Sequence, residues 1–189
     1  MKNINLLSFI AIASIILLGL SSCSKDDPVI EIDQEEYNAA QIIFIPGQME
    51  NGVFVESDDE IVVDFAKDGT PSAHHTHLHA GQAYRMKINL FNNGENINQE
   101  IIDDGDEHQF FFLGAPAGVF EYTYEDNRLG LSGILNVMTS TESAFDFNII
   151  LRHGLNKDHA AAQQWNNPQH IQAGGADDLN FKLEIHVED

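Results

Sequence analysis

The side chains with the clearest capacity for chemistry lie in the segment His74-His75-Thr76-His77-Leu78-His79. Four of the nine histidines of the chain fall within these six residues. In an extended strand alternate side chains share a face, so His75, His77 and His79 would form one row, with neighbouring Cα atoms about 6.6–7 Å apart. Neutral imidazole favours Zn²⁺, Cu²⁺ or Ni²⁺ over Ca²⁺ or Mg²⁺. The segment predicts a transition-metal site, with zinc as first choice; a solvated polar loop is the alternative.

A second group precedes a run of three phenylalanines. Residues 100–108 hold five carboxylates and the imidazole of His108. Alone, this segment is typical of a solvated acidic loop, and its spacing does not match an EF-hand calcium loop. Its interest lies in its position, because a strand beginning at Gln82 can bring the histidine row beside a strand beginning at His108. Glu107 and His108 are then predicted to complete the metal site.

The remaining histidines carry weaker predictions. His153 follows Arg152 at the end of an expected strand, and it is a further candidate ligand at the same site. His159 could reach that site too, although a surface or hydrogen-bonded role suits both residues. We expect His170 and His186 to be exposed.

Sequence patterns of known catalytic sites are missing from this chain. It holds no Gly-x-Ser-x-Gly, no His-Glu-x-x-His and no phosphate-binding loop. A cupin needs a Glu shortly after His-x-His, but residues 80–85 read AGQAYR. A copper–zinc superoxide dismutase needs an internal disulfide, which the single Cys cannot form. We therefore predict a binding protein and no enzyme, with a metalloenzyme as the remaining possibility if water occupies an open metal position.

The elements that must position these side chains are predicted to be strands. Apolar and polar residues alternate along 82–91, 145–152 and 179–187, and shorter β-rich runs cover 41–45, 61–65, 108–113, 120–124 and 131–138. This pattern indicates an all-β, immunoglobulin-like β-sandwich of about eight strands spanning residues 37–189. One small helical insertion is expected at Asn156–Trp165, with a loop as the alternative, and Ile171–Asp178 is expected to be an exposed loop.

Composition limits the class of partner. The 189 residues include 30 Asp and Glu against 9 Lys and Arg, which gives a formal net charge of −21. Nucleic-acid binding needs clustered Lys and Arg, so this charge argues against it. An excess of acids attracts cations over a long range.

The first residues are typical of an export signal. Lys2 precedes an apolar run from Leu6 to Leu20, which is shorter than the roughly 20 residues that a spanning helix needs. The following Leu20-Ser21-Ser22-Cys23 resembles a bacterial lipobox. We predict a signal peptide over residues 1–22 and a lipid anchor on Cys23, so that the acyl chains alone hold the protein on the membrane.

Residues 23–36 are acidic and are predicted to be a tether. Within them, Ser24-Lys25-Asp26-Asp27 resembles the surface-export signal of Bacteroidetes lipoproteins. This resemblance implies an outer-membrane lipoprotein exposed on the cell surface, with the periplasmic face as the alternative.

A broader resemblance covers most of the mature chain. The lipobox, the His-rich segment leading into Gly81-Gln82-x-Tyr84, and the block Asp106-Glu107-His108-Gln109-Phe110-Phe111-Phe112 are similar to a group of small Bacteroidetes lipoproteins. That group is associated with TonB-dependent receptors, and the resemblance implies a role in metal uptake beside such a receptor.

Together these features predict a lipid-anchored protein that binds a transition metal and supports its uptake or sequestration. His77 and His79 are the expected primary ligands, and His75, His108 and Glu107 are expected to complete the shell. The alternative is an accessory module for another ligand, such as a glycan. Sugar sites usually present aromatic platforms, and the chain has one Trp and four Tyr.

Overall fold

The computed structural model describes residues 36–189. The predicted signal peptide, the lipidated Cys23 and nearly all of the predicted tether therefore lie outside the described residues. Within the described part of the chain, no helix is long and apolar enough to cross a membrane.

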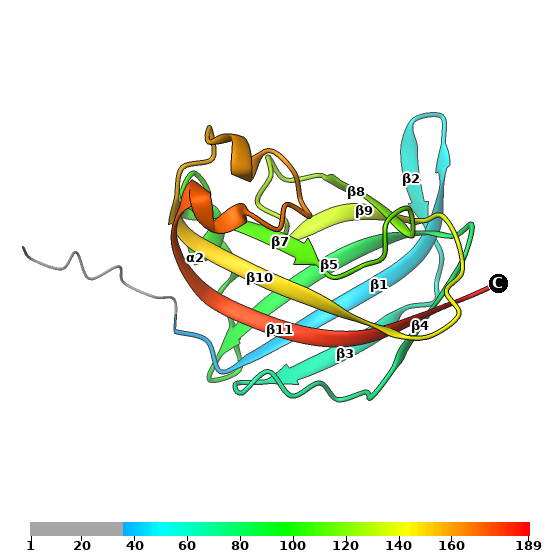
Figure 1. Cartoon of the computed structure of the whole chain (residues 1–189). Helices are drawn as coiled ribbons and strands as arrows, with labels where there is room; N and C mark the ends of the chain where they lie inside the picture. Colours follow the sequence, from blue (N-terminus) through cyan, green and yellow to red (C-terminus); the bar gives the residue numbers. More distant parts are fainter. Residues whose placement is uncertain (1–35) are drawn as a thin grey trace, which may run out of the picture. The chain divides into compact units, whose positions relative to one another are not determined.

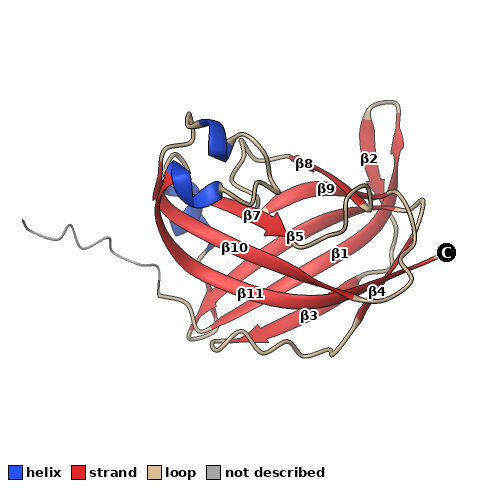
Figure 2. Cartoon of the chain, in the orientation of Figure 1, coloured by secondary structure: helices blue, strands red, loops and turns tan. Residues whose placement is uncertain are grey.

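Within residues 36–189, eleven strands form two sheets that enclose one main core. Figures 1 and 2 show how these strands are arranged. The larger sheet contains β1 (Ala39–Glu50), β2 (Val53–Glu56), β3 (Ile61–Ala66), β5 (Ala83–Asn92), β6 (Glu95–Asn96), β8 (Phe120–Tyr124) and β9 (Ser132–Val137). The smaller sheet has the order β4 (Thr76–His79), β11 (Gly174–Glu188), β10 (Phe145–Leu155) and β7 (Gln109–Leu113). The predicted all-β sandwich is confirmed, with more strands than the pattern alone indicated.

Alternation along the strands decides which side chains enter the core. In β11, the apolar side chains of Leu179, Phe181, Leu183, Ile185 and Val187 are buried, whereas the residues between them are partly or fully exposed. β5 alternates in the same way, with Tyr84, Met86, Ile88 and Leu90 buried. Because successive side chains of a strand point to opposite faces, each strand gives one apolar face to the shared core.

β7 departs from simple alternation because both of its faces are covered. Phe110 and Phe112 lie in the main core, whereas Phe111 belongs to a second cluster with Ile150, Leu155 and three alanines. All three phenylalanines are fully buried.

One predicted strand boundary is wrong. The run ending at Pro46-Gly47 continues as β1 to Glu50, because the Pro46 carbonyl still accepts a hydrogen bond from Ser57 although Pro46 has no N–H to donate. Gly47 allows the hairpin to close, since a Cβ there would lie 2.4 Å from the Val55 carbonyl oxygen.

The predicted helix at Asn156–Trp165 is also wrong. Only a 3₁₀ turn, η2 (Ala160–Ala162), forms there, and the ring Nδ1 of His159 accepts a hydrogen bond from the Ala161 N–H at its start. The α-helix of the described chain, α2 (Asn98–Asp103), lies in the acidic segment before β7. The expected exposed loop Ile171–Asp178 instead contains most of the 3₁₀ turn η3 (His170–Ala173) and the first residues of β11.

β11 connects the two regions that contain the candidate ligands. β10 pairs with β11 from Gly174 to Ile185 and with β7 on its other side, and the last residues of β11 pair in parallel with β4 (Figure 1). The last residues of β10 and the start of β7 therefore lie near the first residues of β11, and β4 lies beside its last residues.

Candidate metal centres

The predicted histidine row lies on β4 and faces away from the core. Thr76 and Leu78 are buried, whereas His77 and His79 are exposed, as the alternation predicts. The parallel pairing sets His77 opposite His186 and His79 opposite Glu188. His75, just before the strand, forms an ion pair with Glu184, with Nδ1 and Oε1 3.2 Å apart.

The structure does not bring His108 to this row, which corrects the prediction that His75, His77, His79, His108 and Glu107 share one site. β4 runs along the last residues of β11, whereas His108 lies beside the first residues of β11. Asp178 and His186 mark these two ends of β11, and eight residues of strand span about 27 Å. The candidate ligands are consequently divided between two groups.

The first group, called the inner site, consists of His108, His153 and Asp178. One potential ligand atom of each residue lies within 4.8 Å of those of the other two. His108 Nε2 is 3.6 Å from Asp178 Oδ2, and His153 Nδ1 is 4.0 Å from the same oxygen. The two imidazole rings stack with their centroids 4.3 Å apart.

Strand alternation places the two histidines of the inner site on the core-facing side. His108 precedes β7 and continues the parity of Phe110 and Phe112, while His153 on β10 continues that of Ile149 and Leu151. Arg152 pairs with Gln109, so His153 and His108 follow as neighbours at the end of the sheet.

A β-bulge places Asp178 beside these rings. Leu151 pairs with Leu179, but Arg152 already pairs with Asp177, so Asp178 is the extra residue of β11. Bulges re-aim side chains, and here the Asp178 side chain is completely buried instead of pointing into solvent. The prediction that this segment is exposed is wrong for Asp178.

Backbone contacts fix the bulge. The buried Arg152 guanidinium pairs with the Asp177 carboxylate and donates hydrogen bonds to the carbonyls of Gly174 and Gly175. Gly175 has φ +73°, and a Cβ there would lie 2.1 Å from the His153 carbonyl oxygen. The sequence at the start of β11 thus holds Asp178 and His153 at a fixed separation.

Two residues of the inner site, Asp178 and His153, have buried polar atoms that lack the hydrogen-bond partners that burial normally requires. Neither carboxylate oxygen of Asp178 accepts a hydrogen bond from a described residue, and His153 Nδ1 has no hydrogen-bond partner either. A carboxylate buried in this way is costly unless a cation neutralises it. The cation can be a metal ion or a proton on one of the imidazoles.

The tautomer of His108 suits metal ligation. Its Nδ1–H donates to the Asp104 carbonyl, with 3.0 Å between nitrogen and oxygen. In the neutral ring the Nε2 lone pair then faces Asp178. Two ligands of a tetrahedral zinc ion lie about 3.3 Å apart, given metal–ligand distances of about 2.0–2.1 Å. The observed 3.6 Å between His108 Nε2 and Asp178 Oδ2 is close to that separation.

Exposure falls along a path from Glu107 to Asp178. The Glu107 side chain is 65% exposed, that of His153 is 16% exposed, and that of Asp178 is fully buried. Glu107 Oε2 lies 3.8 Å from His153 Nε2, on the side opposite Asp178. The charge of Asp178 also acts on Tyr37. The pKa of Tyr37 is raised first by burial and, to a smaller extent, by this charge.

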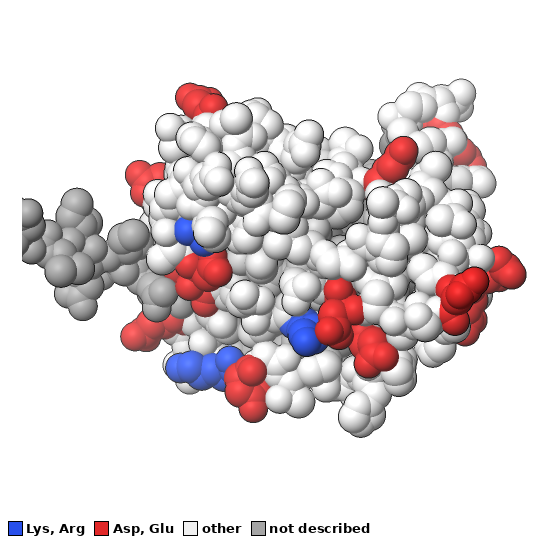
Figure 3. Space-filling view, in the orientation of Figure 1, with Lys and Arg blue, Asp and Glu red and all other residues white. Residues whose placement is uncertain are grey.

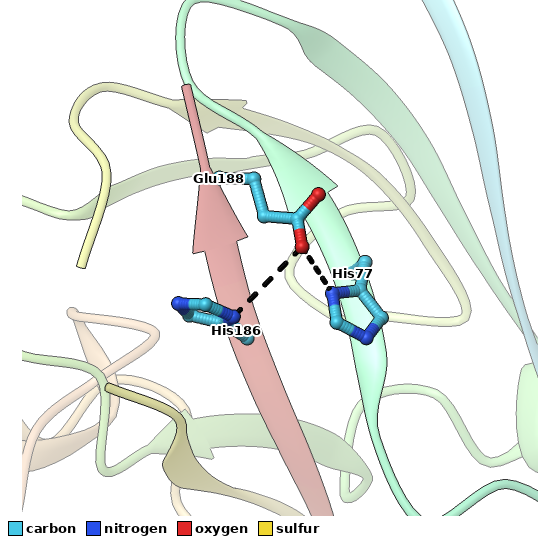
Figure 4. A group of neighbouring side chains, drawn as sticks. All are labelled: His77, His186 and Glu188. Carbon is cyan, nitrogen blue, oxygen red and sulfur yellow. Dashed lines mark hydrogen bonds and ion pairs between the residues drawn. The ribbon is translucent and has the colours of Figure 1, made fainter. Parts of the chain in front are cut away.

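The second group, called the outer site, consists of His77, His186 and Glu188, shown in Figure 4. The Glu188 carboxylate lies between two rings carried by adjacent strands, with Oε1 2.7 Å from His77 Nδ1 and 3.9 Å from His186 Nδ1. His186 Nε2–H donates to the Thr141 carbonyl at 3.2 Å, which leaves Nδ1 to face Glu188. The side chains of His77 and Glu188 are about half exposed.

The other histidines have local roles. His170 is buried against Phe111, contrary to the expectation that it is exposed, and its Nδ1–H donates to the Asn167 carbonyl. Burial lowers the pKa of His170. His159 caps η2 and lies in neither group.

Sequence reasoning missed Asp178, His186 and Glu188 as candidate ligands. Strand alternation could not predict Asp178, because the bulge changes the side of the sheet to which this residue points. The alternating pattern Glu184, His186, Glu188 on the last strand did carry a signal. That this pattern lies beside the histidines of β4 became evident only from the parallel register of the two strands.

Comparison of the chain with protein-family models, with curated proteins and with solved structures gives no match. The geometry of the two groups and the net charge of the chain are therefore the observations that bear on function. On the face shown in Figure 3, acidic side chains outnumber Lys and Arg, in line with the net charge of −21.

Proposed function

We propose that this protein binds a transition-metal ion, with Zn²⁺ as first choice and Cu²⁺ or Ni²⁺ as alternatives, at the inner site. The observation that carries the proposal is the buried Asp178 carboxylate, which accepts no hydrogen bond and faces His108 and His153. Two imidazoles and one carboxylate are a ligand set that zinc accepts, and a fourth position remains for water.

Features around the ligands support the same role. The Asp104 carbonyl orients His108 through the ring nitrogen that would not ligate, as backbone carbonyls commonly do at metal sites. The bulge places Asp178 beside the two rings, and Arg152 stabilises the bulge by donating a hydrogen bond to the Gly174 carbonyl. Glu107 is exposed and offers a first contact for an ion arriving from solvent.

We further propose that the ion is captured for uptake or sequestration at the outer membrane, without catalysis. The lipobox at Cys23 and the acidic residues after it support a lipid anchor at the cell surface, and the resemblance to lipoproteins associated with TonB-dependent receptors supports a receptor as partner. The predicted glycan module gains little support, because Trp165 packs against Tyr122 and the core and offers only part of its ring.

Elemental analysis after metal loading and exhaustive dialysis tests the metal proposal. We expect about one zinc ion to remain on each wild-type chain and none on Asp178→Asn. Asp146→Asn is the matched control, since Asp146 is an exposed carboxylate paired with Lys182. Retention of no metal by the wild-type protein, or equal retention by Asp178→Asn, would overturn the proposal.

Two experiments test the location. Cells labelled with a fatty acid should incorporate it into the wild-type protein but not into Cys23→Ser. Protease treatment of intact cells should then degrade the protein. Protection of the protein in intact cells would place it on the periplasmic face instead.

A further inference from the structure

We propose that the outer site, His77, His186 and Glu188, is a second transition-metal site that is open to solvent and exchanges its ion readily. It goes beyond the inner site, since no residue is shared and the two groups lie at opposite ends of β11. The ions expected there are Zn²⁺, Cu²⁺ and Ni²⁺, for which imidazole is a suitable ligand.

The register of the two strands builds the outer site. Parallel pairing sets His186 directly beside His77 on the outward face, and Glu188 follows two residues later on the same face. The rings of His77 and His186 have centroids 5.8 Å apart. Ligands from two adjacent strands therefore converge without any loop having to fold over them.

A backbone contact prepares His186 for ligation. Its Nε2–H donates to the Thr141 carbonyl, so that the lone pair of the neutral ring is on Nδ1. Thr141 is itself fixed to β11, because its N–H donates to the Val187 carbonyl and its hydroxyl oxygen accepts from the Val187 N–H. An outer partner of this kind sets both the tautomer and the orientation of a metal-ligating ring.

His77 and Glu188 complete a three-ligand set. In the metal-free protein, His77 Nδ1–H donates to Glu188 Oε1 over 2.7 Å. A metal ion would replace that shared proton, and the half-exposed side chains can separate by the few tenths of an ångström that two ligands of one ion require. Three protein ligands leave a tetrahedral ion one open position, and solvent or a donor group of another molecule can occupy it.

Openness gives the outer site a different role from the inner one. An ion with an exposed coordination position can be handed over by ligand exchange, whereas a buried ion must wait for the protein to open. The neighbouring pair His75–Glu184 and the ring of His79 lie on the same outward face. They add further donor atoms near the proposed site.

Calorimetric titration of the full chain with Zn²⁺ tests the inference, and it is done in the wild-type protein and in Asp178→Asn. The variant keeps the outer site while the inner one is impaired, so failure of one site is distinguished from failure of the other. We expect a weaker binding step in both proteins. His186→Ala should weaken that step at least about tenfold in both backgrounds.

His74→Ala is the matched control, because His74 is an exposed histidine in the same segment but outside the group. The inference is overturned if His186→Ala binds zinc as the unmodified background does, or if His74→Ala weakens the step equally. His74 is exposed and His186 is partly exposed, and unchanged circular dichroism will confirm that these variants and the buried Asp178→Asn remain folded.

Discussion

The inner and outer sites offer nearly the same ligands in opposite surroundings. Each contains two histidines and one carboxylate, and in each a backbone carbonyl accepts a hydrogen bond from one ring. Asp178 at the inner site is completely buried, whereas Glu188 at the outer site is about half exposed. The two sites differ in the free-energy cost of the carboxylate when no cation is bound.

At the outer site, solvent and the hydrogen bond from His77 already satisfy Glu188. Surface ion pairs of this kind contribute little to stability, on the order of 0–1 kcal/mol. At the inner site, the fold keeps a carboxylate away from water without supplying a hydrogen-bond donor. Burial thus makes the inner site dependent on a cation, and exposure makes the outer site optional for the fold.

The largest expected effect separates the two carboxylates. Asp178→Leu should abolish tight zinc binding and should not lower the free energy of unfolding of the metal-free protein, because it removes a buried carboxylate that accepts no hydrogen bond. Glu188→Leu should leave tight binding unchanged. Chelator-competition titrations and urea denaturation measure both quantities. A large loss of metal-free stability in Asp178→Leu would contradict this interpretation.

Zinc should stabilise the folded protein through the inner site. An ion present at 100 times its Kd adds about 2.7 kcal/mol to the free energy of unfolding. We expect His153→Gln to lose most of this gain and His77→Gln to keep it. Thermal unfolding with zinc and with a chelator gives the comparison, and equal gains in the two variants would show that the sites are not energetically distinct.

The rate at which the ion is released should show the difference in solvent access between the two sites. When a fast chelator is mixed with zinc-loaded protein, we expect a rapid phase from the outer site and a phase at least about tenfold slower from the inner site. Glu107→Gln should change the slow phase only, since Glu107 is the exposed group beside His153. Stopped-flow absorbance records both phases, and a single phase would argue against two separate sites.

Removing the exposed histidines of β4 should leave the fold almost unaffected. His77→Ala and His79→Ala are expected to change the free energy of unfolding by less than about 0.5 kcal/mol, as is usual for exposed side chains. His77→Ala should weaken the low-affinity step more than His79→Ala, because only His77 belongs to the convergent group. The reverse order would reassign the ligand.

The smallest expected effect concerns His170, which is buried against Phe111. Its pKa is lowered, first by burial. A lowered pKa means that the unfolded chain takes up the proton first as the pH falls, so His170 should favour folding above its unfolded pKa, and this contribution should decline below it. His170→Phe should flatten the pH dependence of stability as the pH falls below the unfolded pKa of about 6.5, as measured by urea denaturation.

Much of the fold follows from alternation that is visible in the sequence. Runs such as 83–92 and 179–187 have one apolar face, so their strands could be predicted without knowing their partners. β2, β6 and α2 could not, because each is only a few residues long. The predicted helix at 156–165 failed because local side-chain contacts, such as the His159 cap, stabilise tight turns instead.

The candidate sites were only half predictable, for a related reason. The outward row on β4 needed only alternation, whereas its partners His186 and Glu188 depended on parallel pairing between strands about 110 residues apart. Asp178 depended on a one-residue bulge. Long-range register and bulges arise from the packing of the whole sheet, and neither leaves a local pattern in the sequence.

The central claim is that the inner site binds the ion most tightly, and Co²⁺ titration of the full chain tests it most directly. Tetrahedral Co²⁺ absorbs visible light strongly, so the first equivalent reports on its ligands. We predict that Asp178→Asn abolishes this early absorption, whereas His186→Ala leaves it unchanged. Loss of the early absorption in His186→Ala, together with its persistence in Asp178→Asn, would contradict the claim and assign tight binding to the outer site.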